Sequence, residues 1–177
     1  HAAAAFVNSV RRAGYEGPLT LVSDEPVSPY HRPPLSKKYL SDALPVEQIL
    51  IRAAAWYEEQ KVTLRLGTRV ARIDRAARRV TLQSGEGCDY DRLILATGAH
   101  AFVPPLLGSS HAGVLPLRTW GDVRSILSRV KPGMRAVCLG GGLLATQSGI
   151  SGQGAYQASF VSFIGLVWVV VVVTMGA

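Results

Sequence analysis

The alternation of helix-like and strand-like segments is the feature that most constrains how this chain can fold. Segments with apolar residues at helical spacing are separated by short apolar or alternating runs that are typical of strands. The predicted helices span residues 2–13, 36–40, 53–60 and 120–130, and the predicted strands span residues 19–23, 49–51, 62–66, 69–74, 79–83, 89–96 and 134–139. This order indicates an α/β fold with a largely parallel sheet. The short strands between residues 62 and 83 indicate a small β-meander inserted into it.

The charge of the chain is basic and unevenly distributed. Its 19 Lys and Arg against 12 Asp and Glu give a formal net charge of +7, and no charged residue lies between positions 136 and 177. No run of Lys and Arg is interleaved with aromatic residues, which argues against nucleic-acid binding. We expect either a solvated basic face or docking to a small acidic protein or an anionic cofactor.

The two cysteines, Cys88 and Cys138, form none of the spacings that hold zinc or make a redox-active pair. The sequence therefore predicts no metal site. Two free thiols are typical of a reducing compartment, so we expect a cytoplasmic protein.

A glycine-rich turn follows the predicted strand 134–139. Residues 140–145 read Gly-Gly-Gly-Leu-Leu-Ala, which matches the pattern G-x-G-x-x-G/A with Ala in the last place. Between a strand and a helix, Gly140 and Gly142 would let the backbone approach a pyrophosphate; the alternative is a glycine turn that only packs. No acidic residue for a ribose follows about 20 residues later, so this half either takes a phosphorylated ribose or is incomplete.

Residues 2–25 have the pattern of the latter part of a βαβ unit. A helix leads into a strand, and the strand ends on Asp24 and Glu25, where an acidic side chain would accept hydrogen bonds from a ribose. The alternative is that both are loop acids. The first strand of the unit and its glycines are not present before His1.

Two further stretches have the composition of a ligand site. Residues 29–37 place Arg32 and Lys37 among three prolines, which leave the loop little backbone entropy to lose. The loop is either stiffened to hold these cations for an anionic ligand, or a surface loop with incidental charges. The predicted strand 89–96 runs into Thr97 and Gly98, where small residues let a chain pass close to a ligand.

In these stretches the chain resembles the FAD-dependent pyridine nucleotide oxidoreductases of the ferredoxin and rubredoxin reductase type. The resemblance covers roughly residues 1–145 and rests on RRAGYEGPLTLVSDE, YHRPPLSKKYL, GTRVARID, DYDRLILATGA, LPLRTWGD and VCLGGGLLA, in that order. It implies a Rossmann-like FAD- and NAD(P)-binding fold, here partial. It also implies electron transfer from NAD(P)H through FAD to an acidic iron–sulfur carrier of the ferredoxin or rubredoxin type. The absence of a CxxxxC motif fits this branch, in which the flavin passes electrons onward directly.

The resemblance also assigns roles by position. It implies FAD contacts from Ala2 at the pyrophosphate, Asp24 or Glu25 at the adenosine ribose, Arg32 and Lys37 at the phosphates and the flavin ring, Val70 through its backbone at the adenine, Ala96, Thr97 and Gly98 in a second FAD motif, and Arg118 at the domain crossing. It implies NAD(P)H contacts from Gly140 and Gly142. It implies no side chain that acts as an acid or base. Gln147 departs from the family pattern, which usually has Glu there.

We expect three parts along the chain: an FAD-binding domain over 1–115 without its first strand, the start of an NAD(P)-binding domain over 116–165, and an apolar tail over 166–177. The tail could be a buried strand, an artefactual end or a membrane anchor, but it lacks the basic flank that would orient a membrane helix. The functional alternative to an oxidoreductase is a non-catalytic truncated fragment or interaction module that does not bind FAD tightly.

Overall fold

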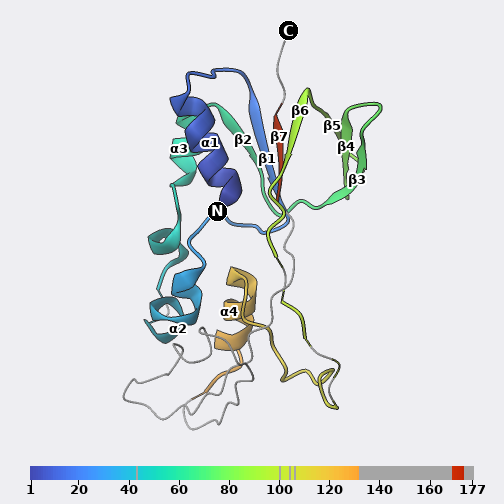
Figure 1. Ribbon diagram of the computed structural model, residues 1–177. Helices are drawn as coiled ribbons and strands as arrows, with labels where there is room; N and C mark the ends of the chain where they lie inside the picture. Colours follow the sequence, from blue (N-terminus) through green and yellow to red (C-terminus); the bar gives the residue numbers. More distant parts are fainter. Residues whose placement is uncertain (43, 100, 104, 106, 132–168, 174–177) are drawn as a thin grey trace. The chain divides into compact units, whose positions relative to one another are not determined.

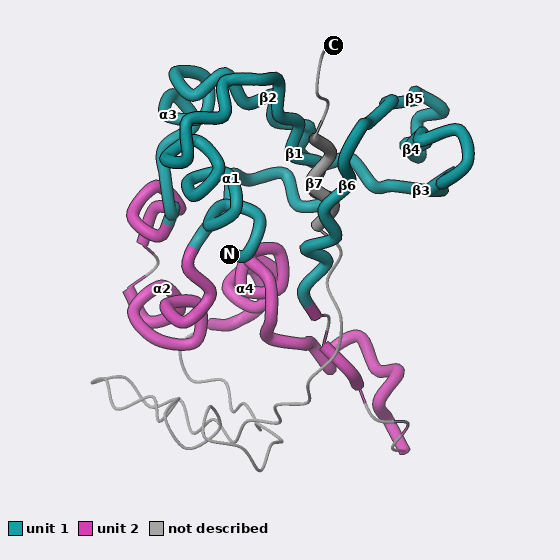
Figure 2. Tube along the Cα trace, turned by 45° about the horizontal axis from the view of Figure 1, so that its top comes forward, with its two compact units in different colours: residues 1–30, 50–98, 167–177 teal, residues 31–49, 99–166 magenta. Residues whose placement is uncertain are grey.

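The computed structural model describes residues 1–42, 44–99, 101–103, 105, 107–131 and 169–173 (Figure 1). The chain divides into two compact units (Figure 2). Unit 1 comprises His1–Tyr30, Leu50–Gly98 and Val167–Ala177, and unit 2 comprises His31–Ile49 and Ala99–Leu166. The division into 1–115, 116–165 and 166–177 stays a prediction.

Unit 1 is built on a four-stranded sheet with the order β2-β1-β7-β6. Its strands are β1 (Leu19–Ser23), β2 (Val62–Arg65), β6 (Arg92–Leu95) and β7 (Val169–Val173). Strands β1 and β2 are parallel, whereas β7 is antiparallel to both β1 and β6, so β1, β2 and β6 run in one direction. The α/β class and the parallel direction of these three strands agree with the prediction. A strand in the apolar tail was one of the predicted alternatives, but its antiparallel direction and its place between β1 and β6 were not predicted.

Two helices, α1 (Ala2–Arg12) and α3 (Ala54–Glu59), contribute to the core of this sheet. Ala3 and Val7 of α1 are buried with Leu21 of β1 and Val62 of β2, and Tyr57 of α3 lies in the same cluster. Small and β-branched residues on α1 allow the helix to lie close to the strands. Both helices match the predicted segments to within one residue at each end.

A three-stranded antiparallel meander forms the rest of unit 1 (Figure 1). Its strands are β3 (Val70–Asp74), β4 (Arg79–Leu82) and β5 (Gly87–Asp89). Val80 and Leu82 are buried against Val22, which attaches the meander to β1. The predicted membership of the meander was wrong: Val62–Arg65 belongs to the main sheet, and β5 was not predicted. The predicted strand 89–96 contains β6, and only its first residue, Asp89, belongs to β5. The break comes at Tyr90, whose N–H donates to the carbonyl of Arg78 rather than to a sheet neighbour.

Unit 2 contains short helical elements and no strand among its described residues. The elements are two 3₁₀ turns, η1 (Pro33–Ser36) and η2 (Val46–Ile49), and two helices, α2 (Lys38–Asp42) and α4 (Trp120–Leu127). The predicted helix 36–40 begins later than expected because the prolines set a 3₁₀ turn first. The predicted strand 49–51 was wrong: Ile49 ends a 3₁₀ turn, and Leu50, which belongs to unit 1, makes only an isolated bridge to Tyr30.

Several predictions fall outside the described residues, namely the strand 134–139, the glycine turn with Gly140 and Gly142, and Gln147. Part of the apolar tail is described, and there Val169–Val173 forms a strand, one of the predicted alternatives. No helix in the described ranges is both long and apolar enough to cross a membrane.

Candidate functional site

A pocket of about 510 Å³ lies in unit 1, where β1 ends and β3 begins. It is lined by Val22, Asp24, Thr68, Arg69, Val70, Ala71, Arg72, Ile73 and Gln83. It therefore brings together Asp24 and Val70, two of the predicted site residues, from separate parts of the chain. The volume falls within the range of about 300–1,000 Å³ that is usual for small-molecule sites.

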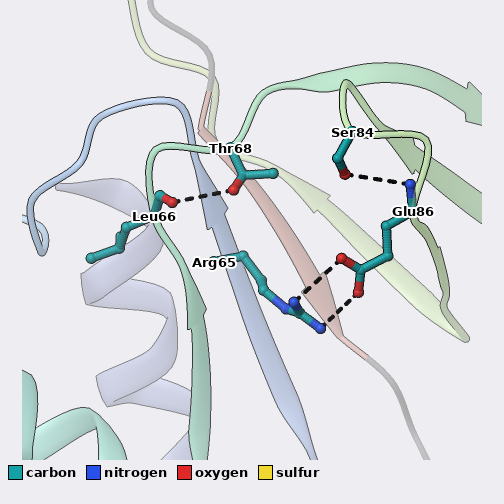
Figure 3. A network of polar contacts seen from close by, with 5 residues as sticks. All are labelled: Arg65, Leu66, Thr68, Ser84 and Glu86. Carbon is teal, nitrogen blue, oxygen red and sulfur yellow. Dashed lines mark hydrogen bonds and ion pairs between the residues drawn. The ribbon is translucent and has the colours of Figure 1, made fainter.

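Backbone hydrogen bonds tie the loop before β3 to the end of β1. The N–H of Thr68 donates to the carbonyl of Ser23 (2.8 Å), and the N–H of Gly67 donates to the carbonyl of Glu25 (3.0 Å). Gly67 has a φ of +63°, a left-handed conformation that glycine adopts at little cost. The Thr68 hydroxyl donates to the carbonyl of Leu66 (3.2 Å) and stabilises the same turn (Figure 3). The turn sets Val70 beside the carboxyl end of β1.

An ion pair attaches the turn between β4 and β5 to the main sheet. The Arg65 guanidinium of β2 contacts the Glu86 carboxylate at 2.9 Å (Figure 3), and both side chains are nearly half exposed. Water screens such a pair, so its contribution to stability is about 1 kcal/mol or less. The N–H of Gln83 donates to the carbonyl of Arg69 (2.8 Å), which fixes a second point of the pocket wall.

The two acids that end β1 have different surroundings. Asp24 is exposed and lines the pocket. Glu25 does not line it: its carboxylate accepts a hydrogen bond of 2.5 Å from the Tyr30 hydroxyl. The sequence left the choice between the two acids open, and the structure places Asp24 on the pocket wall.

The other predicted residues of unit 1 lie near the start of α1 and the end of β6. Ala2 is the first residue of α1. Ala96 packs against the core cluster that contains Ala3 and Val7 of α1. Thr97 follows, and Gly98 has a φ of +64°. None of these residues lines the pocket.

Unit 2 brings two of the predicted cations together. The Arg32 guanidinium donates to the carbonyl of Arg118 at 3.0 Å, although the two residues are 86 positions apart. The Nε of Arg118 donates to the carbonyl of Ala99 at 3.2 Å, so Arg118 connects three segments of this unit. Lys37 follows η1 and is exposed.

The start of α4 is fixed by a reciprocal pair of side-chain caps. The hydroxyl of Thr119 accepts from the N–H of Asp122 (3.1 Å), and the carboxylate of Asp122 accepts from the N–H of Thr119 (2.7 Å). The indole N–H of Trp120 donates to the hydroxyl of Tyr39 (2.6 Å), which joins α4 to α2. The prediction of site residues missed Asp122, although the pattern Thr-x-x-Asp before an apolar run signals a capping box.

Two titratable groups outside the pocket have shifted pKa values. Burial raises the pKa of Tyr57 to about 12, and the nearby Arg52 partly opposes this rise. The Ala77 N–H donates to the Asp74 carboxylate in the turn after β3 and lowers its pKa. Both groups serve the structure of unit 1 rather than the pocket wall.

The pocket has the chemistry of a nucleoside site. A carboxylate such as Asp24 accepts hydrogen bonds from sugar hydroxyls, while Val70 and Ile73 offer an apolar wall to a flat base. Arg69 and Arg72 add positive charge at the same wall. The carboxylate and the apolar wall fit an adenosine, and the two arginines fit the negatively charged phosphates of a dinucleotide.

Comparison with known proteins gives a consistent family. The family described as pyridine nucleotide-disulphide oxidoreductase matches residues 1–157. Rhodocoxin reductase from Rhodococcus erythropolis is 41% identical over 139 residues, which are 78% of this chain and 33% of that protein. The ferredoxin–NAD(+) reductase component of the anthranilate 1,2-dioxygenase system from Burkholderia cepacia is 37% identical over 149 residues, 83% of this chain and 36% of that protein.

Comparison with solved structures gives the same family. The ferredoxin reductase for the CYP199A2 system from Rhodopseudomonas palustris has a TM-score of 0.73 and 32% identity, covering 80% of this chain and 36% of that chain. The reductase in the covalent putidaredoxin reductase–putidaredoxin complex has a TM-score of 0.68 and 36% identity, covering 80% of this chain and 34% of that chain. The chain thus spans about a third of the length of the relatives that it matches.

Proposed function

The chain belongs to the pyridine nucleotide-disulphide oxidoreductase family, and we propose that its parent protein passes electrons from NAD(P)H through FAD to a ferredoxin- or rubredoxin-like carrier. The observation that carries the proposal is the pocket that joins Asp24 and Val70. The similarity to a rubredoxin-NAD(+) reductase and to ferredoxin–NAD(+) reductase components supports the same reaction class.

In unit 1, Asp24 would hold the adenosine ribose of FAD by accepting hydrogen bonds from its hydroxyls. The backbone of Val70 would contact the adenine. Glu25 would have a structural role, because its carboxylate already accepts a hydrogen bond from the Tyr30 hydroxyl. This arrangement supports Asp24 over Glu25 as the acid that contacts the cofactor.

Small residues would allow the backbone to approach the pyrophosphate. Ala2 stands at the N-terminus of the 11-residue helix α1, where N–H groups and the helix dipole favour an anion. Ala96, Thr97 and Gly98 would form the second FAD motif after β6. A larger side chain in either place would obstruct a close approach.

In unit 2, Arg32 and Lys37 would supply positive charge to the phosphates and the flavin ring. Arg32 is held by the carbonyl of Arg118, which limits its conformations before any ligand binds. FAD held by these residues would supply the redox chemistry between NAD(P)H and the carrier, while the protein supplies orientation and electrostatics. Gly140 and Gly142 remain proposed for NAD(P)H.

The proposed acceptor is an acidic iron–sulfur protein. The net charge of +7 would favour encounter with such a carrier and make the rate fall as salt rises. We place this activity in the cytoplasm. The functional alternative is a non-catalytic fragment or interaction module that does not hold FAD tightly.

Titration of the purified full chain with FAD tests the proposal, with flavin absorbance and fluorescence quenching as readouts. We expect binding, and Asp24→Asn should raise the Kd for FAD about tenfold, because a hydrogen bond to a charged group is lost. Glu59→Gln, at the exposed end of α3, is the control and should leave the Kd unchanged.

A colourless chain that cannot be reconstituted with FAD would overturn the proposal for these residues and favour the fragment alternative. Turnover with NAD(P)H and an acceptor dye would exclude that alternative.

A further inference from the structure

The carboxylate of Asp122 is bonded to more of the chain than a helix cap requires. One of its oxygens accepts from the N–H of Thr119 (2.7 Å) and also from the N–H of Arg118 (3.0 Å). The first bond belongs to the capping box. The second lies one residue before the cap and restrains the backbone at Arg118.

Arg118 is where two other segments of unit 2 attach. Its carbonyl accepts from the Arg32 guanidinium at 3.0 Å, and its own Nε donates to the carbonyl of Ala99 at 3.2 Å. The Arg118 carbonyl lies in the same planar peptide group as the Thr119 N–H that Asp122 binds, so a rotation of that peptide would move the contact with Arg32. The orientation of the Arg32 guanidinium depends on a carbonyl whose residue is held by Asp122.

We propose that Asp122 is a positioning residue of the FAD site: it fixes the backbone of Arg118 and, through the Arg118 carbonyl, holds the Arg32 guanidinium in its ligand-binding orientation. The inference rests on the proposed function. Asp122 itself contacts no cofactor in this proposal. A guanidinium held in one orientation loses less conformational entropy when an anion binds, so the effect is on affinity.

Thr119 separates this role from helix capping. Its hydroxyl accepts from the Asp122 N–H (3.1 Å) and forms the other half of the capping box, but no hydrogen bond joins that hydroxyl to Arg118. Thr119→Val removes the cap and keeps the shape of the side chain. Asp122→Ala removes the cap and the restraint on Arg118 together. Both variants should lower the thermal midpoint of unfolding.

The test is FAD titration of the full chain and these variants, well below their thermal midpoints. We expect the Kd for FAD to rise about tenfold in Asp122→Ala and to change by less than about threefold in Thr119→Val. Asp122→Asn keeps an oxygen acceptor in place, so it should fold like the wild type and restore most of the affinity. Equal Kd increases in Asp122→Ala and Thr119→Val would show that only the cap matters and would overturn the inference.

A second measurement uses Arg32. If Asp122 acts through it, then Asp122→Ala should weaken FAD binding much less in an Arg32→Met background than in the wild type. Independent, multiplicative effects would overturn the inference even if both residues matter. A wild-type chain that binds no FAD would instead overturn the proposed function, and with it this role of Asp122.

Discussion

Tyr57 shows at the scale of one residue how the core of unit 1 handles a polar group. The side chain is fully buried, and its hydroxyl has no hydrogen-bond partner among the described residues. Its ring meets the Trp56 ring edge-on, with centroids 5.1 Å apart. A buried hydroxyl without a partner lowers stability, because water solvated it in the unfolded chain.

The same burial makes the stability of unit 1 sensitive to alkali. Burial raises the pKa of Tyr57 to about 12 in the folded chain, from an ordinary value of 10.0. Between pH 10 and pH 12 the folded state therefore keeps the Tyr57 proton while the unfolded state loses it. The free energy of unfolding does not depend on this group below pH 10, and it falls as the pH rises from 10 toward 12. Between pH 8 and pH 11, we expect the free energy of unfolding of Tyr57→Phe to rise by about 1 kcal/mol relative to that of the wild type.

Urea unfolding at a series of pH values measures this difference. The contributions of the other titrating groups to the free energy of unfolding are the same in both proteins, so they cancel in the difference. A Tyr57→Phe curve that stays parallel to the wild-type curve up to pH 11 would contradict the prediction.

At the scale of elements, Arg11 joins α1 to the segment after α3. Its guanidinium donates to four carbonyls, those of Tyr15 (2.6 Å), Gly17 (2.8 Å), Gln60 (2.8 Å) and Lys61 (3.3 Å). The planar fork of Arg can reach acceptors in several directions, whereas the ammonium of Lys cannot match this geometry. The interaction thus sets how α1 leads into β1.

Arg11→Lys should therefore lower the free energy of unfolding by about 2 kcal/mol, since two or more carbonyls would lose a charged donor. The adjacent Arg12 is exposed and gives a matched control: Arg12→Lys should leave stability unchanged. Chemical denaturation followed by far-UV circular dichroism measures both. Equal values for the two variants would show that the four hydrogen bonds contribute nothing.

Local sequence signals predicted where helices and strands begin and end better than they predicted which strands pair. Leu19–Ser23 was predicted with its observed bounds, because Gly17 and Pro18 precede it and two acids follow it. The meander was assigned the wrong strands, because an alternating run such as Val62–Arg65 fits either sheet. Which sheet a short strand joins depends on distant segments, and these leave no mark within the strand itself.

At the scale of the whole molecule, β7 completes a sheet whose neighbouring strands lie far away in the sequence. Val171 is paired with Leu21 of β1 on one side and with Ile94 of β6 on the other. Without this strand, two rows of backbone groups would lose their partners. Five valines carry no pattern that could specify a direction or a register, so the sequence could not predict this pairing.

Val171→Pro should lower the free energy of unfolding by about 3 kcal/mol, since proline removes an N–H from a strand that is paired on both sides. Val171→Ile keeps the N–H and the β-branch and should have a small effect. Hydrogen exchange of the β1 and β6 amides gives a second readout. If Val171→Pro unfolds like the wild type, these residues do not hold this place in the sheet.

By itself, the sequence determined the α/β class, most of the helices and strands, the family, and the residues Asp24, Val70 and Arg32 as candidates, because each of these depends on local spacing or on a recurring motif. Only the tertiary structure decided that Asp24 and not Glu25 lines the pocket, that Arg32 is held by Arg118, and that Asp122 restrains that same residue. The contact between Arg32 and Arg118 joins segments 86 positions apart, and no local spacing encodes it. A Thr-x-x-Asp spacing can indicate the helix cap, but only the fold shows that the residue held by Asp122 also holds Arg32.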